Sequence, residues 1–205
     1  MKLLVVAATQ KELNQVYEHF NLANQDFIQT EQFDILITGV GMTATAFALG
    51  TIINDQYNLV LNVGIAGSFD IKIPLGNLVT IKTDVLAELG AEDNDDFLTI
   101  DELGFGTNTF SATYFISDLQ QVNAITVNKV HGNAESIKTS IKRFNPTVES
   151  MEGAAVFYAC NKSNIPCVQV RAISNYVEPR NRDNWQIGLA VKNLNDWLIR
   201  FITNL

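Results

Sequence analysis

The stretch Glu149-Ser150-Met151-Glu152-Gly153-Ala154-Ala155, followed further along by Val170-Arg171-Ala172-Ile173-Ser174-Asn175, decides the fold of this chain. Between the two motifs the sequence has a helical pattern and then an apolar strand pattern. An acidic residue therefore opens a helix, and a polar pair closes the next strand. Ligands of open α/β sheets bind at such strand ends, so we expect both motifs to face one crevice.

The residue types in these motifs suit a nucleoside. A carboxylate at Glu152 can accept hydrogen bonds from two sugar hydroxyls, and the thioether of Met151 can pack under the sugar ring. The amide of Asn175 offers a donor and an acceptor to a purine edge. Glutamates that open helices are also common as partners of the helix dipole, so Glu152 alone has a purely structural explanation. The two motifs together favour the binding site.

Apolar patterning predicts an alternation of strands and helices. Strand-like runs fall at residues 2–8, 33–38, 59–63, 78–87, 124–130 and 167–174. Helical patterns fall at residues 10–20, 43–56, 133–144, 153–164 and 183–204. Several strand runs are apolar on both faces, which is typical of strands covered by helices on both sides. We therefore expect a three-layer α/β fold, built as one domain over residues 1–205.

The segment at residues 88–110 departs from this alternation. It is rich in Asp and Glu and contains three glycines. Long excursions in compact domains are often functional or lie at interfaces. A solvated acidic loop explains the same composition equally well, and the sequence leaves both explanations open.

Composition argues against several classes of function. The chain has 205 residues and a net charge of −8, which disfavours binding to nucleic acid backbones and to anionic membranes. No apolar run approaches the roughly 20 residues of a membrane span, and the first run is too short for a signal peptide. Cys160 and Cys167 fall on a helix pattern and a strand pattern, as expected for reduced, buried thiols of a cytoplasmic protein. No metal-ligand spacing is present, so we expect no metal site.

Two turns that contain glycine follow strand patterns. Gly39-Val40-Gly41-Met42-Thr43-Ala44 resembles a dinucleotide-binding turn, but the acidic residue expected at the end of the next strand is missing. The hydroxyl side chains of this segment suit the capping of the helix that follows. The second turn, Asn62-Val63-Gly64-Ile65-Ala66-Gly67-Ser68, is either part of a ligand crevice or a plain tight turn.

Glu12 and His131 are further candidates for a site. Glu12 lies where the first strand meets the first helix. There it can be a general base at the edge of the sheet, or only a partner of the helix dipole. His131 follows Val130 at the end of a strand pattern, where it can line a pocket. All arginines lie in the last third of the chain, so the glycine turns have no nearby arginine to bind free phosphate.

With these residues in place, the chain resembles the purine nucleoside phosphorylase and nucleosidase superfamily over nearly its whole length. The resemblance is strongest to its hydrolases, which act on methylthioadenosine and S-adenosylhomocysteine or on futalosine. It implies a three-layer α/β/α sandwich with a mixed central sheet, cleavage of a purine N-glycosidic bond, and no metal or organic cofactor. It also implies a small-molecule nucleoside as partner, and a homodimer in which we expect residues 97–114 to form the contact.

The resemblance implies a role for each matching residue. Glu12 corresponds to the acid that orients and deprotonates the attacking water, and Arg171 helps to hold that site. Met151 packs on the ribose, and Glu152 accepts from its hydroxyls. The other matches line the site, with Ser174 and Asn175 at the purine, Ile65, Ala66 and Gly67 along the second glycine turn, and Val130 and His131 contacting the base through their backbone.

Two departures from the adenosine-type pattern favour a 6-oxopurine. Asn175 stands where those enzymes carry an aspartate, and an amide can donate to a 6-oxo group and still address N7. A neutral amide cannot be a general acid, so hydrogen bonds or a water must stabilise the departing base. Ser150 stands where those enzymes usually have a glutamate. We therefore expect a futalosine-type hydrolase that releases hypoxanthine in menaquinone biosynthesis. The alternatives are a methylthioadenosine/S-adenosylhomocysteine nucleosidase, a phosphorylase and a non-catalytic nucleoside-binding protein.

Residues 176–185 resemble the loop that closes over the 5′-substituent in this superfamily. Futalosine ends in a carboxyphenyl ketone, so Arg180 or Arg182 is expected to pair with its carboxylate. Trp185 or Tyr176 is expected to cover its ring. A helix cap with surface charges explains the same residues equally well.

Overall fold

The structure, a computed structural model, describes residues 2–94 and 96–205. Within these residues the centre is a mixed sheet of nine strands, and a separate hairpin has two more. The strands are β1 (Leu3–Ala7), β2 (Phe27–Gln29), β3 (Phe33–Ile37), β4 (Leu59–Ser68), β5 (Leu78–Leu86), β6 (Gly90–Asp93), β7 (Asp96–Thr99), β8 (Thr109–Ser111), β9 (Gln120–Thr126), β10 (Val148–Ser150) and β11 (Cys167–Tyr176). The α-helices are α1 (Asn14–His19), α2 (Met42–Ile52), α3 (Ala134–Phe144), α4 (Gly153–Ser163) and α5 (Ile187–Thr203), and the 3-10 helices are η1 (Gln10–Leu13) and η2 (Arg182–Asn184).

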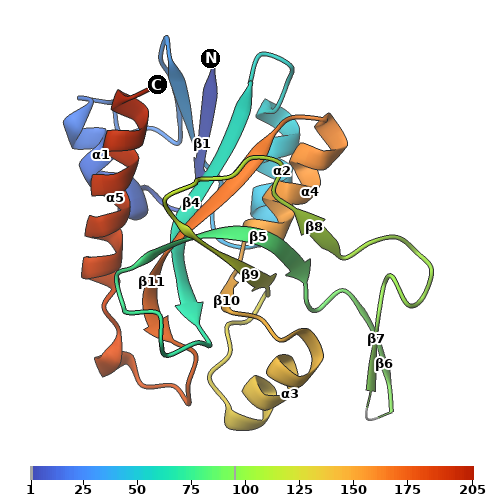
Figure 1. The fold of residues 1–205 in the computed structure, drawn as a ribbon. Coiled ribbons are helices and arrows are strands. Elements are labelled where there is room, and N and C mark those ends of the chain that lie inside the picture. Colours follow the sequence, from blue (N-terminus) through green and yellow to red (C-terminus); the bar gives the residue numbers. More distant parts are fainter. Residues whose placement is uncertain (1, 95) are drawn as a thin grey trace.

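Helices cover both faces of the sheet. Figure 1 shows α1 and α5 on one side and α2 and α4 on the other. Each pair of helices encloses its own apolar core, with Leu13, Leu194 and Leu198 in one and Leu49, Val156 and Phe157 in the other. The strands between them are buried on both faces, which explains their continuous apolar runs. The expected three-layer α/β/α fold with a mixed sheet is confirmed.

Part of the sheet closes on itself. β4 pairs with β11, β11 with β5, β5 with β9 and β9 with β10, and β10 returns to pair with β4. In the last pairing Glu149 lies opposite Gly67. The sequence pattern did not predict β10, because a strand of only three residues that includes a glutamate has no clear apolar alternation. This closure brings the motif at Glu149 to the end of β4.

Several predicted boundaries were wrong. β9 occupies Gln120–Thr126 and not residues 124–130, so Val130 and His131 lie in the loop before α3. The last helix begins at Ile187, after the separate turn η2, and not at residue 183. The expected hydroxyl cap of α2 is also wrong, because its N-cap is Gly41, with φ +94° and no side-chain hydrogen bond.

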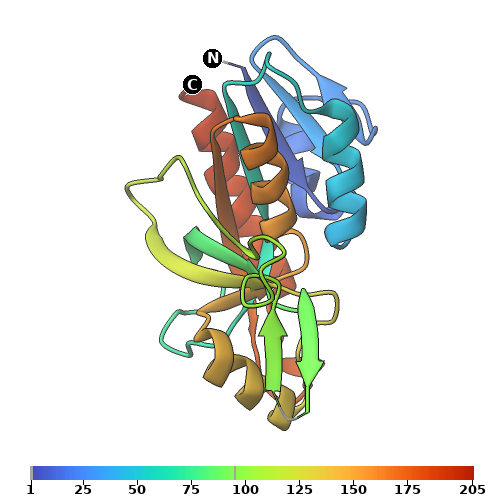
Figure 2. The ribbon, with the colours of Figure 1, turned by 90° about the vertical axis from the view of Figure 1, so that its right-hand side faces the viewer.

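The acidic excursion at residues 88–110 contains its own hairpin, β6–β7, and ends in β8 at the edge of β5. Figure 2 shows the hairpin projecting from the body beside α3. The guanidinium of Arg143 on α3 lies 4.7 Å from the centre of the Phe97 ring, which ties the hairpin to that helix. The excursion therefore contains regular structure, although most of its described residues are exposed to solvent.

Cys160 on α4 and Cys167 on β11 are both free and buried, as predicted. None of the helices among the described residues has the length and apolar character needed to cross a membrane.

Candidate active site

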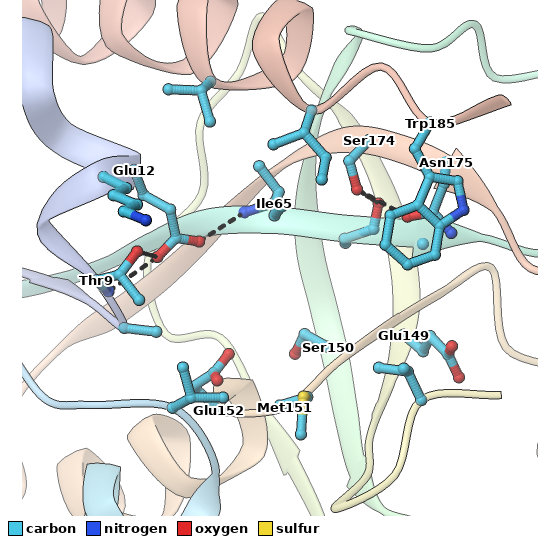
Figure 3. Close-up of a pocket in the computed structure, with 18 of the residues that line it drawn as sticks. Thr9, Glu12, Ile65, Glu149, Ser150, Met151, Glu152, Ser174, Asn175 and Trp185 are labelled. Carbon is cyan, nitrogen blue, oxygen red and sulfur yellow. Dashed lines mark hydrogen bonds between the residues drawn. The ribbon is translucent and has the colours of Figure 1, made fainter. Parts of the chain in front are cut away.

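A cavity of about 370 Å³ opens where β1, β4 and β11 end. The loop before α3, β10 and the start of α5 complete its wall. Figure 3 shows Glu12 at one end of this pocket and Asn175, Trp185 and Glu149 at the other, with Met151 between them. The lining residues are Ala8, Thr9, Lys11, Glu12, Val40, Ile65, Ala66, Gly67, Val130, His131, Glu149, Ser150, Met151, Glu152, Ser174, Asn175, Trp185, Ile187 and Val191.

Glu12 is fixed at its end of the pocket by three hydrogen bonds. The backbone N–H of Thr9 donates to Oε2 at 3.0 Å, and the Thr9 hydroxyl lies 3.1 Å from the same oxygen. The N–H of Ile65 donates to Oε1 at 3.2 Å. Thr9 and Glu12 form a capping box at the start of η1, so the same contacts that begin the helix also orient the carboxylate.

Burial raises the pKa of Glu12 above its ordinary value of 4.5, because protein surrounds the carboxylate although part of the residue faces the cavity. The positive charge of Arg171 and the N–H of Ile65 act in the opposite direction, and the negative charge of Glu152 adds to the increase. A carboxylate with a raised pKa is a stronger base. Glu12 therefore has the position and the electrostatics of a group that takes a proton from water.

Glu152 is the N-cap of α4 and is held from two sides. The N–H of Gly41 donates to its Oε1 at 3.0 Å, and Arg171 Nη1 lies 3.8 Å from its Oε2. Gly39 and Gly41 both have positive φ angles, at +82° and +94°, which glycine adopts without strain. The first glycine turn therefore delivers a backbone N–H to Glu152.

Arg171 lies behind the pocket wall and is 1% exposed. Its Nε donates to Gln169 Oε1 at 2.7 Å, and its Nη2 donates to Asn62 Oδ1 at 2.5 Å. Gln169 Nε2 in turn donates to Asp84 Oδ2 at 2.9 Å. Burial raises the pKa of Asp84 to about 6, against the hydrogen bonds from Gln169 and Thr126. A buried chain of polar side chains therefore sets the direction of the guanidinium.

Asn175 has a fixed orientation at the other end of the pocket. Its Nδ2 donates to the carbonyl of Tyr176 at 3.0 Å, and its Oδ1 lies 2.8 Å from the Ser174 hydroxyl. A carbonyl only accepts, so this contact identifies the nitrogen of the amide. Nδ2 carries two hydrogens, so one N–H remains for a ligand.

His131 lines the pocket, but its backbone N–H is engaged within the protein. It donates to Glu149 Oε1 at 3.0 Å, and the ring Nδ1 lies 2.5 Å from Glu149 Oε2. This N–H is therefore not free for a ligand in this arrangement, and the expected contact between the base and the backbone of Val130 and His131 stays a prediction. Val130 lines the pocket beside it.

Arg180 and Arg182 do not line the pocket, and the expectation that one of them pairs with a substrate carboxylate stays a prediction. Both are exposed, and their guanidinium carbons lie 5.1 and 5.5 Å from the centre of the Trp185 ring. Trp185 itself lines the pocket. The N–H of Arg180 donates to the carbonyl of Gly132 at 3.1 Å, so this loop packs against the loop of His131.

The sequence matches the phosphorylase superfamily over residues 2–203. The chain belongs to this superfamily. Among curated proteins it is 31% identical to the futalosine hydrolase of Streptomyces coelicolor, over 96% of this chain and 93% of that protein. It is 25% identical to a 5′-methylthioadenosine/S-adenosylhomocysteine nucleosidase of Shewanella frigidimarina, over 85% of this chain and 86% of that protein.

Solved structures support the fold of this superfamily member. The native futalosine hydrolase of Helicobacter pylori superposes with a TM-score of 0.83 at 15% identity, covering 100% of this chain and 98% of that one. A 5′-methylthioadenosine/S-adenosylhomocysteine nucleosidase from the same organism gives a TM-score of 0.85, also at 15% identity, covering 100% and 99%.

Sequence reasoning missed several lining residues of this superfamily member. Glu149 and Ser150 lie in the motif that was quoted first, but only the two residues after them were assigned to the site. Val40 lies between two glycines, an unusual place for an exposed apolar side chain. Ile187 and Val191 were missed because the last helix was predicted to begin at residue 183, which hid the face of α5 that meets the pocket.

No group of three His, Cys, Asp or Glu side chains in the described part of the chain has the geometry to hold a metal ion.

Proposed function

We propose that this protein hydrolyses the N-glycosidic bond of futalosine and releases hypoxanthine and dehypoxanthine futalosine. The observation that carries the proposal is the carboxylate of Glu12, oriented by Thr9 and Ile65, made more basic by burial, and facing a pocket of nucleoside size. The likeness to a futalosine hydrolase over most of the chain supports the choice of substrate.

The sugar lies over Met151 in this proposal. Glu152 accepts hydrogen bonds from the ribose hydroxyls, while Gly41 and Arg171 hold its carboxylate in place. The bond between C1′ and the purine nitrogen lengthens first, so the sugar gains the character of an oxocarbenium ion. The carboxylate of Glu152 stabilises this positive charge. Glu12 takes one proton from a water whose oxygen bonds to C1′.

The electron pair of the broken bond leaves with the purine. The free N–H of Asn175 donates to the departing base, at N7 or at the 6-oxo group, and lowers the energy of the purine anion. The base takes a proton from a second water, because an amide has no acidic proton to give. The hydroxide that this leaves takes the proton from Glu12, which restores the carboxylate. These steps need no metal or organic cofactor.

Water is favoured over phosphate as the nucleophile. The described residues that line the pocket include no arginine, and Arg171 is already engaged by Gln169 and Asn62. Phosphate is usually held by the planar fork of arginine side chains. Lys11 and His131 are the basic residues in the lining, and His131 is paired with Glu149.

The test is product release from futalosine, inosine and methylthioadenosine, with and without phosphate. We expect hypoxanthine from futalosine to form fastest and to form equally fast without phosphate. Adenine from methylthioadenosine as the main product would show an adenosine-type nucleosidase. A rate proportional to phosphate would show a phosphorylase, and ligand binding without base release would show a binding protein.

The loop at residues 176–185 covers the 5′-substituent in this proposal. Trp185 already lines the pocket, and the guanidinium groups of Arg180 and Arg182 lie over its ring. Rotation of one arginine toward the cavity would place its guanidinium at the carboxylate of futalosine.

We propose that the protein forms a homodimer through the face that carries α2, α4 and the excursion at residues 88–110. Phe105 is 79% exposed and lines a second cavity. Phe47 is 75% exposed and lies on α2, which borders that cavity. Exposed apolar groups of this size mark contact surfaces. Phe105→Asp should produce monomers in light-scattering measurements. The matched control is Ile71→Asp, because Ile71 is 75% exposed in the turn between β4 and β5. Monomeric wild-type protein would contradict the proposal.

The site of action in this proposal is the cytoplasm, within menaquinone biosynthesis. Two free, buried thiols agree with a reducing compartment. The matched region runs over residues 2–203, in agreement with one nucleosidase domain.

A further inference from the structure

Glu149 is a buried carboxylate in the pocket, without a role in the mechanism above. It is 3% exposed, and its two hydrogen bonds within the protein both go to His131. A carboxylate offers about four acceptor sites, so capacity remains on the side that lines the cavity. A buried charge is costly unless it is fully paired. Acceptor capacity that the protein leaves unused and that faces a cavity therefore indicates a ligand that donates a hydrogen bond there.

The sheet places Glu149 opposite Asn175 across a glycine. Gly67 on β4 pairs with Glu149 on β10 and with Asn175 on β11. A Cβ added at Gly67 would lie 3.3 Å from Asn175 Nδ2 and 3.6 Å from Glu149 Cγ. Gly67 therefore lets these two side chains approach each other at the pocket wall. The part of the pocket next to Gly67, called the slot from here on, has an amide N–H on one side and a carboxylate on the other.

We propose that Glu149 is a specificity-determining residue that accepts a hydrogen bond from N1–H of a 6-oxopurine. This inference rests on the proposed function and names the group that reads the base. Hypoxanthine carries a hydrogen on N1, next to the 6-oxo acceptor. The N1 of adenine carries no hydrogen, so it can only accept a hydrogen bond, as a carboxylate does. With Asn175 donating to the N7 and 6-oxo edge, the slot matches hypoxanthine. With adenine, the Glu149 carboxylate and the unprotonated N1 would face each other as two acceptors.

His131 is the positioning residue of this pair. Its backbone N–H and ring nitrogen hold one oxygen each of the Glu149 carboxylate. The Phe69 ring packs edge-on against the imidazole, with the two centres 6.1 Å apart. These contacts fix the carboxylate before a ligand arrives, so the base finds an acceptor that is already oriented.

The test measures binding of the free bases hypoxanthine and adenine to the full-length protein by calorimetry, together with kcat/KM for futalosine. Wild-type protein should bind hypoxanthine at least 10-fold more tightly than adenine. Glu149→Gln should reduce this ratio by roughly 10- to 100-fold, the usual effect of a hydrogen bond to a charged group. Most of the change should come from weaker hypoxanthine binding, with adenine binding unchanged or tighter.

Two further variants separate recognition from structure. Glu31→Gln is the matched control, because Glu31 is exposed in the turn between β2 and β3, outside the pocket. It should leave the ratio unchanged. Glu149→Asp keeps the charge but shortens the side chain, and it should bind hypoxanthine less tightly while still preferring it. This variant also tests the proposal if Glu149→Gln does not fold.

Each outcome has a distinct meaning. Equal losses for both bases in Glu149→Gln would overturn the inference and leave Glu149 as a support for the loop of His131. An unchanged ratio would overturn it as well. Because base binding does not require catalysis, failure of wild-type protein to cleave futalosine would contradict the proposed function while the binding ratio still tests Glu149.

Discussion

Gly64 and Gly67 lie on the same strand, β4, and serve opposite ends of one pocket. A Cβ at Gly64 would overlap Arg171 Nη1 and come within 2.9 Å of Glu12 Oε1, so its space is filled by the protein's own charged groups. At Gly67 the nearest contacts are Val177 Cγ2 at 3.0 Å and the two polar side chains of the slot. Gly64 lets charged groups pack together, whereas Gly67 lets Asn175 and Glu149 lie close to each other at the pocket wall.

This difference separates chemistry from recognition. The Gly64 end holds Glu12 and Arg171 in place through bonds within the protein, as expected for groups that must be oriented before the reaction. The Gly67 end leaves one N–H of Asn175 and part of the Glu149 carboxylate without partners, as expected for groups that bind a base. Changes at the first end should alter kcat, and changes at the second should alter which base is released.

The largest effect should come from Gly64→Ala. The added methyl group must displace the Arg171 guanidinium, so both Glu12 and Glu152 lose their orientation, and kcat should fall by about 10³-fold or more. Gly67→Ala is the matched change at the other end. Its tightest neighbours are 3.0 to 3.3 Å away and can shift, so KM should rise by about 10-fold with a smaller change in kcat. Steady-state kinetics with futalosine measures both, and equal losses would contradict the division.

Glu12→Gln should lower kcat by about 10²- to 10⁴-fold and leave base binding intact. The acid must be ionised to take a proton, and burial raises its folded pKa above 4.5. Activity should therefore be lost as the pH falls through this raised value, and the acidic limb of kcat/KM should lie above 4.5. A pH profile of futalosine cleavage measures the limb. A limb at or below 4.5 would exclude Glu12 as the base.

Asn175→Asp should change which base leaves, and not how water is activated. A carboxylic acid at this position can protonate N7 and accept from an amino group, so the ratio of adenosine-type to inosine-type cleavage should rise by roughly 10- to 100-fold. Competition between adenine and hypoxanthine nucleosides measures the ratio. The acidic limb assigned to Glu12 should stay in place, and its displacement would contradict the separation of the two ends.

Asp84 should make stability depend on pH. Its folded pKa of about 6 lies above the ordinary 3.8, so its contribution is fully present below 3.8 and is lost as the pH rises through 6. The loss should be about 3 kcal/mol in the free energy of unfolding. Urea unfolding of wild-type protein and Asp84→Asn at pH 4 and pH 7 measures the difference between them. A wild-type protein that gains stability relative to the variant over this interval would contradict the sign.

The smallest effects should come from the exposed loop. Arg180→Ala and Arg182→Ala should raise KM for futalosine by about 3- to 10-fold and leave inosine unaffected, because only futalosine has a carboxylate at that end. Equal effects on both substrates would show that these arginines only support Trp185.

The sequence predicted the layers, most strands and the Glu12 end of the pocket, because long apolar runs and helix-opening acids are local signals. It did not predict the slot at Gly67. β10 is too short for a periodic pattern, and its pairing with β4 joins residues far apart in the chain. The valines Val127 and Val130 extend the apolar pattern past the end of β9, so the strand was placed too far along and the loop that carries His131 was not recognised. The direction of Arg180 and Arg182 depends on their packing against Trp185, which has no signature in sequence.

The most direct test of the two-ended pocket is a crystal structure of Glu12→Gln with intact futalosine bound. The account predicts the hypoxanthine ring beside Gly67, with Asn175 Nδ2 donating to its N7 or 6-oxo edge and N1 within hydrogen-bonding distance of the Glu149 carboxylate. C1′ should face the side chain at position 12, with the ribose over Met151. A base bound at the Glu12 end, or one that contacts neither Asn175 nor Glu149, would contradict the account.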